Sequence, residues 1–202
     1  GIQAEPDLRA RLVAEIAAKS DDPIITGFMH PDRIYLLGDP PNYEPGAAAS
    51  VSAIARAEGV DVWAKLLDLM LVDGGRELLN SPVANYSNGT LEPVREMLLH
   101  PTSAFGLGDG GAHAGQTCDA STTTFLLTHW ARDRAEGRLP LELAVHKTTQ
   151  ATATLYGLGD RGVLAPGYVG DANVIDFERL ALHRPTKVAD LPGGAARLIQ
   201  RA

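Results

Sequence analysis

The chain has 202 residues, of which 45% are hydrophobic and 21% are charged, a composition typical of soluble globular proteins. This length is enough for one sizeable domain, or for one domain and a piece of another. A net charge of −7 and the lack of any basic block argue against a protein that binds nucleic acid or an anionic membrane surface.

The first hundred residues alternate between short helices, strands and loops. Leu8, Leu12 and Ile16 recur at helical spacing, which predicts an amphipathic helix. Ser50 and Asp61 each precede another helical stretch and are predicted to cap it. The patterns predict helices at 7–19, 51–58, 62–73 and 91–100, strands at 24–28 and 33–38, and a proline-rich loop at 38–46.

The second hundred residues continue this alternation as far as residue 158. The predicted elements are a strand at 102–107, a glycine-rich loop at 106–115, a helix at 122–136 capped by Ser or Thr, a helix at 140–158, and a strand at 172–177. Helix–strand alternation up to residue 158 predicts an α/β fold, and the composition after it predicts a small β segment. We therefore expect a domain boundary near residue 159.

The chain carries no membrane or secretion pattern. Its longest apolar run, residues 66–72, contains Asp68 and is far too short to span a bilayer. The first ten residues are mostly polar and do not resemble a secretory signal. Cys118 is the single cysteine and cannot form an internal disulfide, which fits a reducing compartment. We expect a cytoplasmic protein without a membrane partner.

The glycine-rich loop "GLGDGGAHAG" (106–115) combines Asp109 and His113 with five glycines. A strand, this loop and then a helix is the order of a βα loop, which in (β/α)₈ barrels lies on the catalytic face. Glycines beside Asp109 would let the backbone approach a metal or substrate closely. An ordinary Asp-Gly turn explains the same pattern. His113 could be a base, a ligand, a substrate contact or a surface side chain.

Other side chains that could carry chemistry have structural interpretations. His129 and His146 lie on predicted helices beside apolar residues, where packed or surface histidines are the better interpretation. Cys118 fits a small buried side chain better than a nucleophile. Ser103 and Ser121 lie outside any Gly-x-Ser-x-Gly elbow. The sequence contains neither His-x-His nor His-Glu-x-x-His, so we expect no complete metal site within this chain.

Four stretches together resemble the D-aminoacylase and N-acyl-D-amino-acid deacylase branch of the amidohydrolase superfamily. The most specific one contains "LGDRGVLAPGYVGDANVIDF", in which a helix leads to a Pro-Gly turn and a Val-Ile-Asp strand. The stretches are residues 33–45, 106–121, 141–177 and 188–202. The resemblance covers nearly the whole chain.

This resemblance implies the fold of a C-terminal part of such an enzyme. Residues 1–158 would supply the last βα units of a partial TIM-like (β/α) barrel. Residues 159–202 would supply a short β segment of the β-sandwich appendage. The family's His-x-His and its other metal ligands have no counterparts here and would lie upstream of Gly1.

The resemblance also implies a function for Asp109. In the family, the Asp at this place contacts the catalytic metal or its water and acts as general base and acid. The parent enzyme would use Zn²⁺ and a metal-activated water to cleave the amide bond of an N-acyl-(D-)amino acid. His113 would contact the substrate. Residues 110–121 contain no Arg or Lys, unlike the better-known D-aminoacylases, where an Arg after the Asp binds the substrate carboxylate.

Two alternatives remain beside this interpretation. One is a superfamily relative that acts on a cyclic amide, as hydantoinases and dihydroorotases do. The other is a non-catalytic α/β scaffold fragment. In either case we expect the isolated chain to be inactive, because it lacks metal ligands. We also expect it to form homo-oligomers through the apolar edges that missing strands would expose.

Overall fold

The computed structural model describes residues 5–86, 88–106, 108 and 113–202. The chain forms two compact units, Gly1–Pro93 and Val94–Ala202. Within the described ranges, none of the helices is long and apolar enough to cross a membrane. The domain boundary expected near residue 159 stays a prediction.

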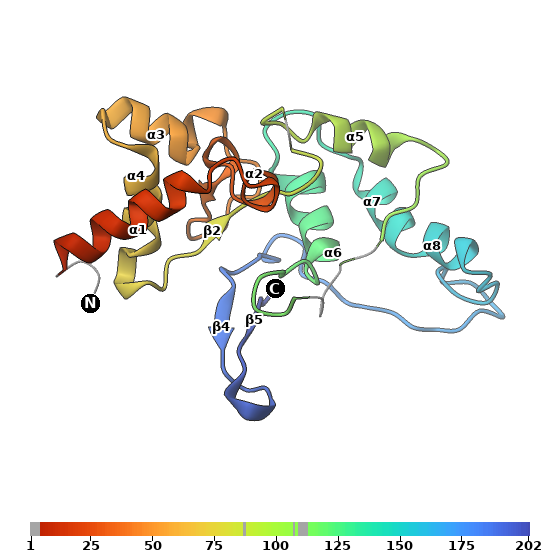
Figure 1. Cartoon of the computed structure of the whole chain (residues 1–202). Coiled ribbons are helices and arrows are strands. Elements are labelled where there is room, and N and C mark those ends of the chain that lie inside the picture. The colour runs from red at the N-terminus through yellow and green to blue at the C-terminus, as the bar shows by residue number, and fades with distance from the viewer. Residues whose placement is uncertain (1–4, 87, 107, 109–112) are drawn as a thin grey trace. The chain divides into compact units, whose positions relative to one another are not determined.

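The first unit is made mainly of short helices (Figure 1). Two of them begin at the predicted caps. Ser50 Oγ accepts a hydrogen bond from the Ala53 amide at 3.2 Å. Asp61 Oδ1 accepts from the Trp63 and Ala64 amides at 3.0 and 2.9 Å, which satisfies donors that the helix itself leaves unpaired. The elements are α1 (Pro6–Ala18), α2 (Pro23–Phe28), a 3₁₀ turn (Pro31–Arg33), β1 (Tyr35–Leu36), a 3₁₀ turn (Ala47–Ala49), α3 (Val51–Glu58), α4 (Val62–Met70), a 3₁₀ turn (Val72–Gly74) and β2 (Leu79–Asn80).

A small apolar core holds this unit together. Its buried members come from the residue before β1, from α3 and from α4; they are Ile34, Val51, Leu66 and Leu69. Full burial of one such side chain contributes about 1.5–3 kcal/mol. Strands β1 and β2 pair antiparallel beside this core, with Tyr35 opposite Asn80.

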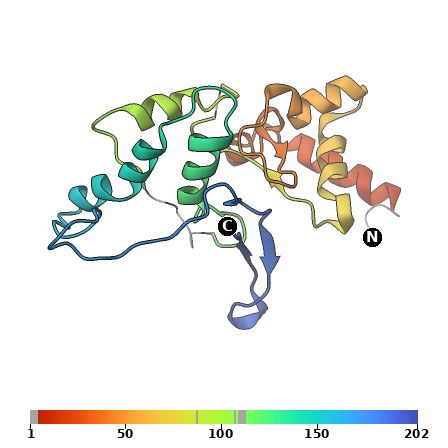
Figure 2. The ribbon, with the colours of Figure 1, turned by 180° about the vertical axis from the view of Figure 1, so that it is seen from behind.

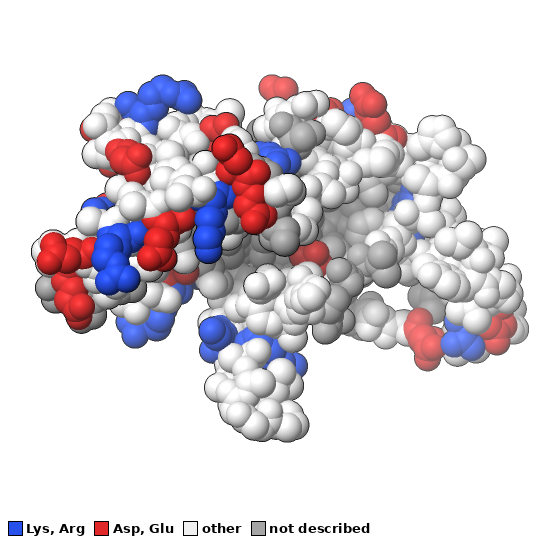
Figure 3. All heavy atoms as spheres, viewed as in Figure 1, with Lys and Arg blue, Asp and Glu red and all other residues white. Residues whose placement is uncertain are grey.

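Charged side chains of both signs cover the surface of the first unit. On the face drawn in Figure 3, acidic and basic side chains are mixed over α1. Arg9 of α1 binds Asp68 of α4 at 2.7 Å, and Lys65 binds Glu58 at 2.7 Å. Exposed pairs of this kind contribute little stability, so the apolar core decides the packing of these helices.

Two predicted strands of the first unit need correction. The strand predicted at 24–28 is wrong, because this segment lies in α2. A short β-branched run does not distinguish a strand from a helix, and Pro23 at the first helical position favours the helix. The strand predicted at 33–38 is confirmed only at Tyr35–Leu36.

Over its described residues, the second unit contains helices and a β-hairpin (Figures 1 and 2). Helix α5 begins at the junction between the units. The elements are α5 (Glu92–Leu99), α6 (Thr122–Phe125) continued by a π-helical segment (Leu126–Asp133), α7 (Leu141–Thr148), α8 (Gln150–Leu155), β4 (Thr186–Val188) and β5 (Arg197–Ile199). Strands β4 and β5 pair antiparallel, with Lys187 opposite Leu198.

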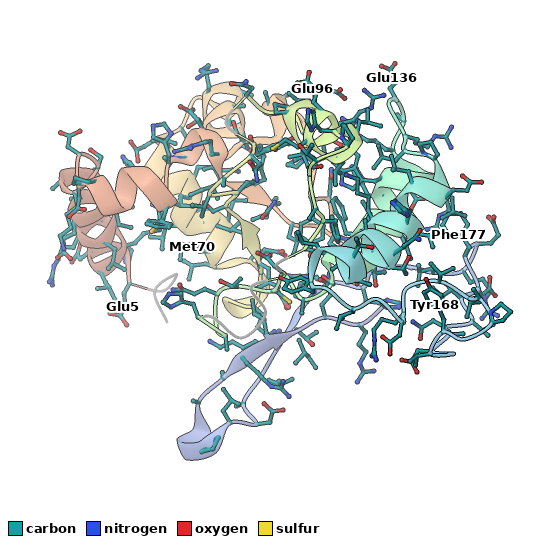
Figure 4. The ribbon with its side chains drawn as sticks, turned by 90° about the vertical axis from the view of Figure 1, so that its right-hand side faces the viewer. Glu5, Met70, Glu96, Glu136, Tyr168 and Phe177 are labelled. Atoms are coloured by element: carbon teal, nitrogen blue, oxygen red, sulfur yellow. The ribbon has the colours of Figure 1, made fainter. Side chains whose placement is uncertain are left out.

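Aromatic and cationic contacts tie the second unit together. Trp130 is buried in the π-helical segment, and the Arg134 guanidinium lies 4.7 Å from its ring centroid. The Arg132 guanidinium lies 5.6 Å from the ring centroid of Phe177, which Figure 4 labels. Arg132 also donates to the Leu180 carbonyl at 2.8 Å. These contacts fasten the irregular segment around residues 177–180 to the helix.

The predicted α/β class agrees with this mixture of helices and few strands. Among the residues that the structure describes, the paired strands are all antiparallel. The strand predicted at 172–177 is wrong, since this segment is irregular and Val174 is fully exposed. The strand predicted at 102–107 is also wrong over its described residues, which form a turn and irregular chain. A strand needs a hydrogen-bonded neighbour, and neither segment has one within the described ranges.

The two predicted long helices of this unit are also modified. The helix predicted at 122–136 ends at Asp133. The Ser121 hydroxyl accepts no hydrogen bond from a helix amide and instead donates to Gln200 Oε1. The helix predicted at 140–158 breaks between α7 and α8 at Thr149, where φ is −125° and ψ is −91°. Thr149 Oγ1 donates to the Val145 carbonyl at 2.7 Å, the kind of side-chain hydrogen bond that competes with regular helix.

Candidate active site

The glycine-rich loop 106–115 is the candidate active site, and its flanks are described although its centre is not. Asp109, the predicted catalytic and metal-contacting residue, lies outside the described residues. The described positions of the loop are Gly106, Gly108 and residues 113–115. The segments that lead into the loop and out of it define its described surroundings.

The segment that leads into the loop follows α5 and is held by α7. Lys147 Nζ donates to the His100 carbonyl at 2.8 Å, to the Ser103 carbonyl at 2.6 Å and to Ser103 Oγ at 3.0 Å. The Ser103 hydroxyl in turn donates to the Met97 carbonyl in α5. The Thr152 hydroxyl of α8 lies 3.4 Å from the Phe105 carbonyl. Residues 100–105 are thus fixed against the helix pair α7–α8.

The segment that leads out of the loop is held by β5. The Ala114 carbonyl accepts a hydrogen bond from the Leu198 amide at 2.8 Å. The His113 carbonyl accepts from the Gln116 and Thr117 amides at 2.7 and 3.1 Å, which closes a tight turn. Both ends of the loop are therefore fastened to regular elements that lie far from it in sequence.

His113, the predicted substrate contact, is exposed and has a φ of 45°. A positive φ is uncommon for residues other than glycine and is held here by the turn that its carbonyl closes. The exposed imidazole is accessible to a ligand, and its role stays a prediction.

Gly108 allows a close backbone contact beside Asp109. A Cβ atom at this position would lie 2.9 Å from the Asp119 carbonyl oxygen and 3.4 Å from the Ala120 Cα. Any side chain would push residues 108 and 119 apart. At this position the absence of a Cβ allows close backbone packing, and the predicted space around a reacting group stays a prediction.

Cys118 behaves as the sequence predicts. Its thiol is half-buried, and burial, followed by the nearby Asp119 carboxylate, raises the pKa of Cys118 above its ordinary value. A raised pKa keeps the thiol protonated at neutral pH, and a protonated thiol is a poor nucleophile.

The helix histidines also have structural surroundings. The His129 ring stacks on Phe125 with 4.5 Å between centroids and meets Trp130 edge-on at 5.5 Å, which confirms a packed histidine. His146 is exposed at a shallow hollow that Gln150 and Gly162 also line.

Sequence reasoning missed Lys147 and His100. A lysine within an apolar helical pattern carries no signal that its ammonium group is buried. His100 Nδ1 lies 3.3 Å from the Thr102 amide and 2.9 Å from the Thr102 hydroxyl, which shapes the turn before the loop. Neither contact follows from residue spacing alone.

The described residues do not by themselves form a metal centre. They contain no group of three His, Cys, Asp or Glu side chains placed to hold a metal ion. His30 and Asp32 lie 3.4 Å apart, but two donors do not make the three-ligand set of a catalytic zinc. A catalytic metal therefore does not fit the described residues alone.

Comparison with known proteins identifies the family. The model of the amidohydrolase family matches residues 9–195, which is nearly the whole chain. The chain belongs to the amidohydrolase family. A D-aminoacylase from Alcaligenes xylosoxydans xylosoxydans is 45% identical over 65 residues, which cover 32% of this chain and 11% of that protein. No solved structure matches the chain.

The amidohydrolase family is generally metal-dependent, and the local identity makes this chain similar to a D-aminoacylase over 65 residues. The "LGDRG" motif of the resemblance has a clear structural role. Gly162, its last residue, has a φ of +84°, and a Cβ there would lie 2.9 Å from the Gln150 Cα. The Asp160 carbonyl accepts from the Val169 amide at 2.7 Å, so the motif folds back against the start of α8.

Proposed function

We propose that this chain is the C-terminal portion of a metal-dependent hydrolase that cleaves the amide bond of an N-acyl-(D-)amino acid. The observation that carries the proposal is the match of the amidohydrolase family model to residues 9–195. The local identity to a D-aminoacylase supports an N-acylated amino acid as substrate. In this proposal the last βα units of a TIM-like barrel come from residues 1–158, and a β segment of the appendage comes from residues 159–202.

Asp109 is the proton-transfer residue in this proposal. Its carboxylate takes a proton from the attacking water and later gives one to the leaving nitrogen, a role that requires a fixed position within hydrogen-bond reach. Support comes from the two fastened ends of the loop, at Ser103 and at Ala114. His113, exposed at the end of the same loop, is proposed to contact the substrate.

Zinc is the metal of the proposed enzyme, and it would polarise the reacting groups and lower the pKa of a bound water to about 7. The described residues do not assemble a ligand set, so the donors would have to come largely from elsewhere in the parent protein. The 65 matched residues span only 11% of the D-aminoacylase, which leaves most of that protein to supply them. Accordingly, the isolated chain is proposed to be inactive.

The proposed association of copies of this chain rests on exposed apolar side chains. Leu155, Tyr156 and Leu164 of the second unit are 65%, 75% and 75% exposed. Large exposed apolar side chains favour association, so we include homo-oligomer formation in the proposal. A cytoplasmic setting, in which Cys118 stays a free thiol, belongs to the same proposal.

The test compares the parent enzyme with its Asp109→Asn variant. Zinc-loaded protein is assayed against N-acetyl-D-amino acids and against a hydantoin. We expect hydrolysis of the former, and a loss of about 10²- to 10⁴-fold in kcat for Asp109→Asn. Asp171→Asn, which alters an exposed carboxylate, is the matched control and should keep the wild-type kcat.

Three results would contradict the proposal. Full activity of Asp109→Asn would remove the proton-transfer role. Preference for the hydantoin would move the enzyme to the cyclic-amide branch. Turnover by the 202-residue chain alone with zinc would show that its own residues complete the metal site.

A further inference from the structure

The buried ammonium group of Lys147 has no role in the function proposed above. Lys147 lies on α7 and is only 5% exposed. Its Nζ has three hydrogen-bond acceptors within 3.0 Å, and all belong to His100 or Ser103. An ammonium group has three protons to donate, so this site satisfies it completely.

The surroundings of Lys147 explain how a buried cation is tolerated. No carboxylate within the described ranges forms an ion pair with it. Its acceptors lie instead just past the C-terminal end of α5: two oxygens of Ser103, and the His100 carbonyl, which also accepts from the Ser103 amide at 3.3 Å. A cation at a helix C-terminus is favourable, and a buried one without any partner would be costly.

The same contacts fix the start of the glycine-rich loop. Ser103 binds Lys147 through both its carbonyl and its hydroxyl, and it stands six residues before Asp109. The Thr152 hydroxyl donates to the Lys147 carbonyl at 2.7 Å and lies 3.4 Å from the Phe105 carbonyl. Lys147 of α7 and Thr152 of α8 therefore hold the backbone of residues 100–105 together.

We propose that Lys147 is a positioning residue: its ammonium group holds residues 100–105, the segment that leads to the proposed proton-transfer residue Asp109. This inference rests on the proposed function. Residues 100–105 lead into the loop, so a change in their position would be passed along the chain toward residue 109. Displacement of a catalytic group by about 1 Å can lower the rate about 10²-fold.

The first experiment measures amide hydrogen exchange of the 202-residue chain. Lys147→Met keeps the length of the side chain and removes its donors. We expect exchange of the amides in residues 101–106 to rise about tenfold or more, because hydrogen bonds to a charged group are lost. Lys187→Met, at an exposed lysine of β4, is the control and should leave this segment unchanged.

A milder variant covers the case in which Lys147→Met fails to fold. Thr152→Val keeps the branched shape and removes only the hydroxyl that reaches the Lys147 and Phe105 carbonyls. We expect a smaller increase of exchange, confined to residues 103–106. Unchanged exchange in this variant and in a folded Lys147→Met chain would overturn the inference.

The second experiment separates positioning from a purely structural role. In the active parent enzyme, Lys147→Met should lower kcat about 10- to 100-fold with KM changed less than about twofold. Lys147→Arg, which restores a cation with several donors, should recover part of kcat. If Lys147→Met keeps the wild-type kcat while Asp109→Asn is inactive, the positioning role is overturned and the proposed function stands. An active Asp109→Asn would overturn the proposed function itself.

Discussion

Among the described residues, the two units differ in the charged side chains that they bury. The first closes around the aliphatic side chains of Ile34, Val51, Leu66 and Leu69. The second buries apolar side chains too, but also Arg134 and Lys147. The buried cations are satisfied by backbone carbonyls and by an aromatic ring. The unit that carries the glycine-rich loop is thus held by directed contacts as well as by apolar area.

This difference has consequences for stability and precision. Apolar contacts are not directional. The first unit should therefore stay folded when its core side chains shift slightly, as long as the buried volume is kept. Directed hydrogen bonds fix the position of the backbone more closely and are costly to leave unpaired. A catalytic loop benefits from the second kind of support.

The largest expected effect is a large-to-small change in the apolar core of the first unit. Leu66 is 1% exposed, and Leu66→Ala should lower the free energy of unfolding of this unit by about 2–5 kcal/mol. Met70→Ala is the control on the same helix, because Met70 is 43% exposed. Chemical denaturation followed by tryptophan fluorescence measures both variants. Equal losses for the two would contradict an apolar core centred on α3 and α4.

A second variant tests the tight packing of the second unit. Gly162→Ala places a Cβ 2.9 Å from the Gln150 Cα at a backbone φ of +84°. Left-handed backbone costs a non-glycine residue about 1–2 kcal/mol, and the close contact adds to it. Gly170→Ala, with open space around it, should be nearly neutral. Thermal unfolding should show a lower melting temperature only for Gly162→Ala; an unchanged one would contradict the close approach of this loop to α8.

The sequence predicted local features well and long-range pairing poorly. Ser50 and Asp61 cap their helices as expected, because capping depends on residues within one turn. The strands predicted at 102–107 and 172–177 failed, because a strand is decided by a partner that local patterns do not specify. The break at Thr149 depends on side-chain hydrogen bonds that compete with the helix.

The candidate site was predictable to a similar extent. The glycine-rich loop and the family follow from motifs that can be read in the chain. Lys147 does not, since its importance comes from an ammonium group that meets carbonyls 44 and 47 residues away. The close approach of Gly108 to the Asp119 carbonyl could not be predicted, because residue spacing does not show which distant backbone a glycine meets.

A buried tyrosine makes the stability of the first unit depend on alkaline pH. Tyr86 donates to the Pro45 carbonyl in the first unit. Burial, followed by the nearby Tyr35 and Glu44, raises the pKa of Tyr86 from 10.0 to about 12. The neutral phenol is therefore favoured in the folded state. Its contribution to stability is complete below pH 10.0 and is lost as the pH rises to about 12.

Alkaline unfolding curves of wild type and Tyr86→Phe test this assignment. At neutral pH the variant should be less stable by about 1 kcal/mol, because the Pro45 carbonyl loses its donor. Above pH 10.0 the difference should shrink, since wild type alone must ionise this phenol on unfolding. A constant difference across the alkaline range would contradict a raised pKa of Tyr86.

The smallest effect is expected at the hairpin of the second unit. Arg197 donates to both carboxylate oxygens of Asp190 at 2.9 and 2.8 Å, and this hydrogen bonding lowers the pKa of Asp190 below its ordinary value. The contribution of the pair is complete above the ordinary pKa of an aspartate and is lost as the pH falls through the lowered pKa of Asp190. Both side chains are exposed, so water and salt screen the attraction. Asp190→Asn should therefore leave the melting temperature unchanged at physiological salt, and a clear loss there would show that exposed pairs stabilise this unit as the buried cations do.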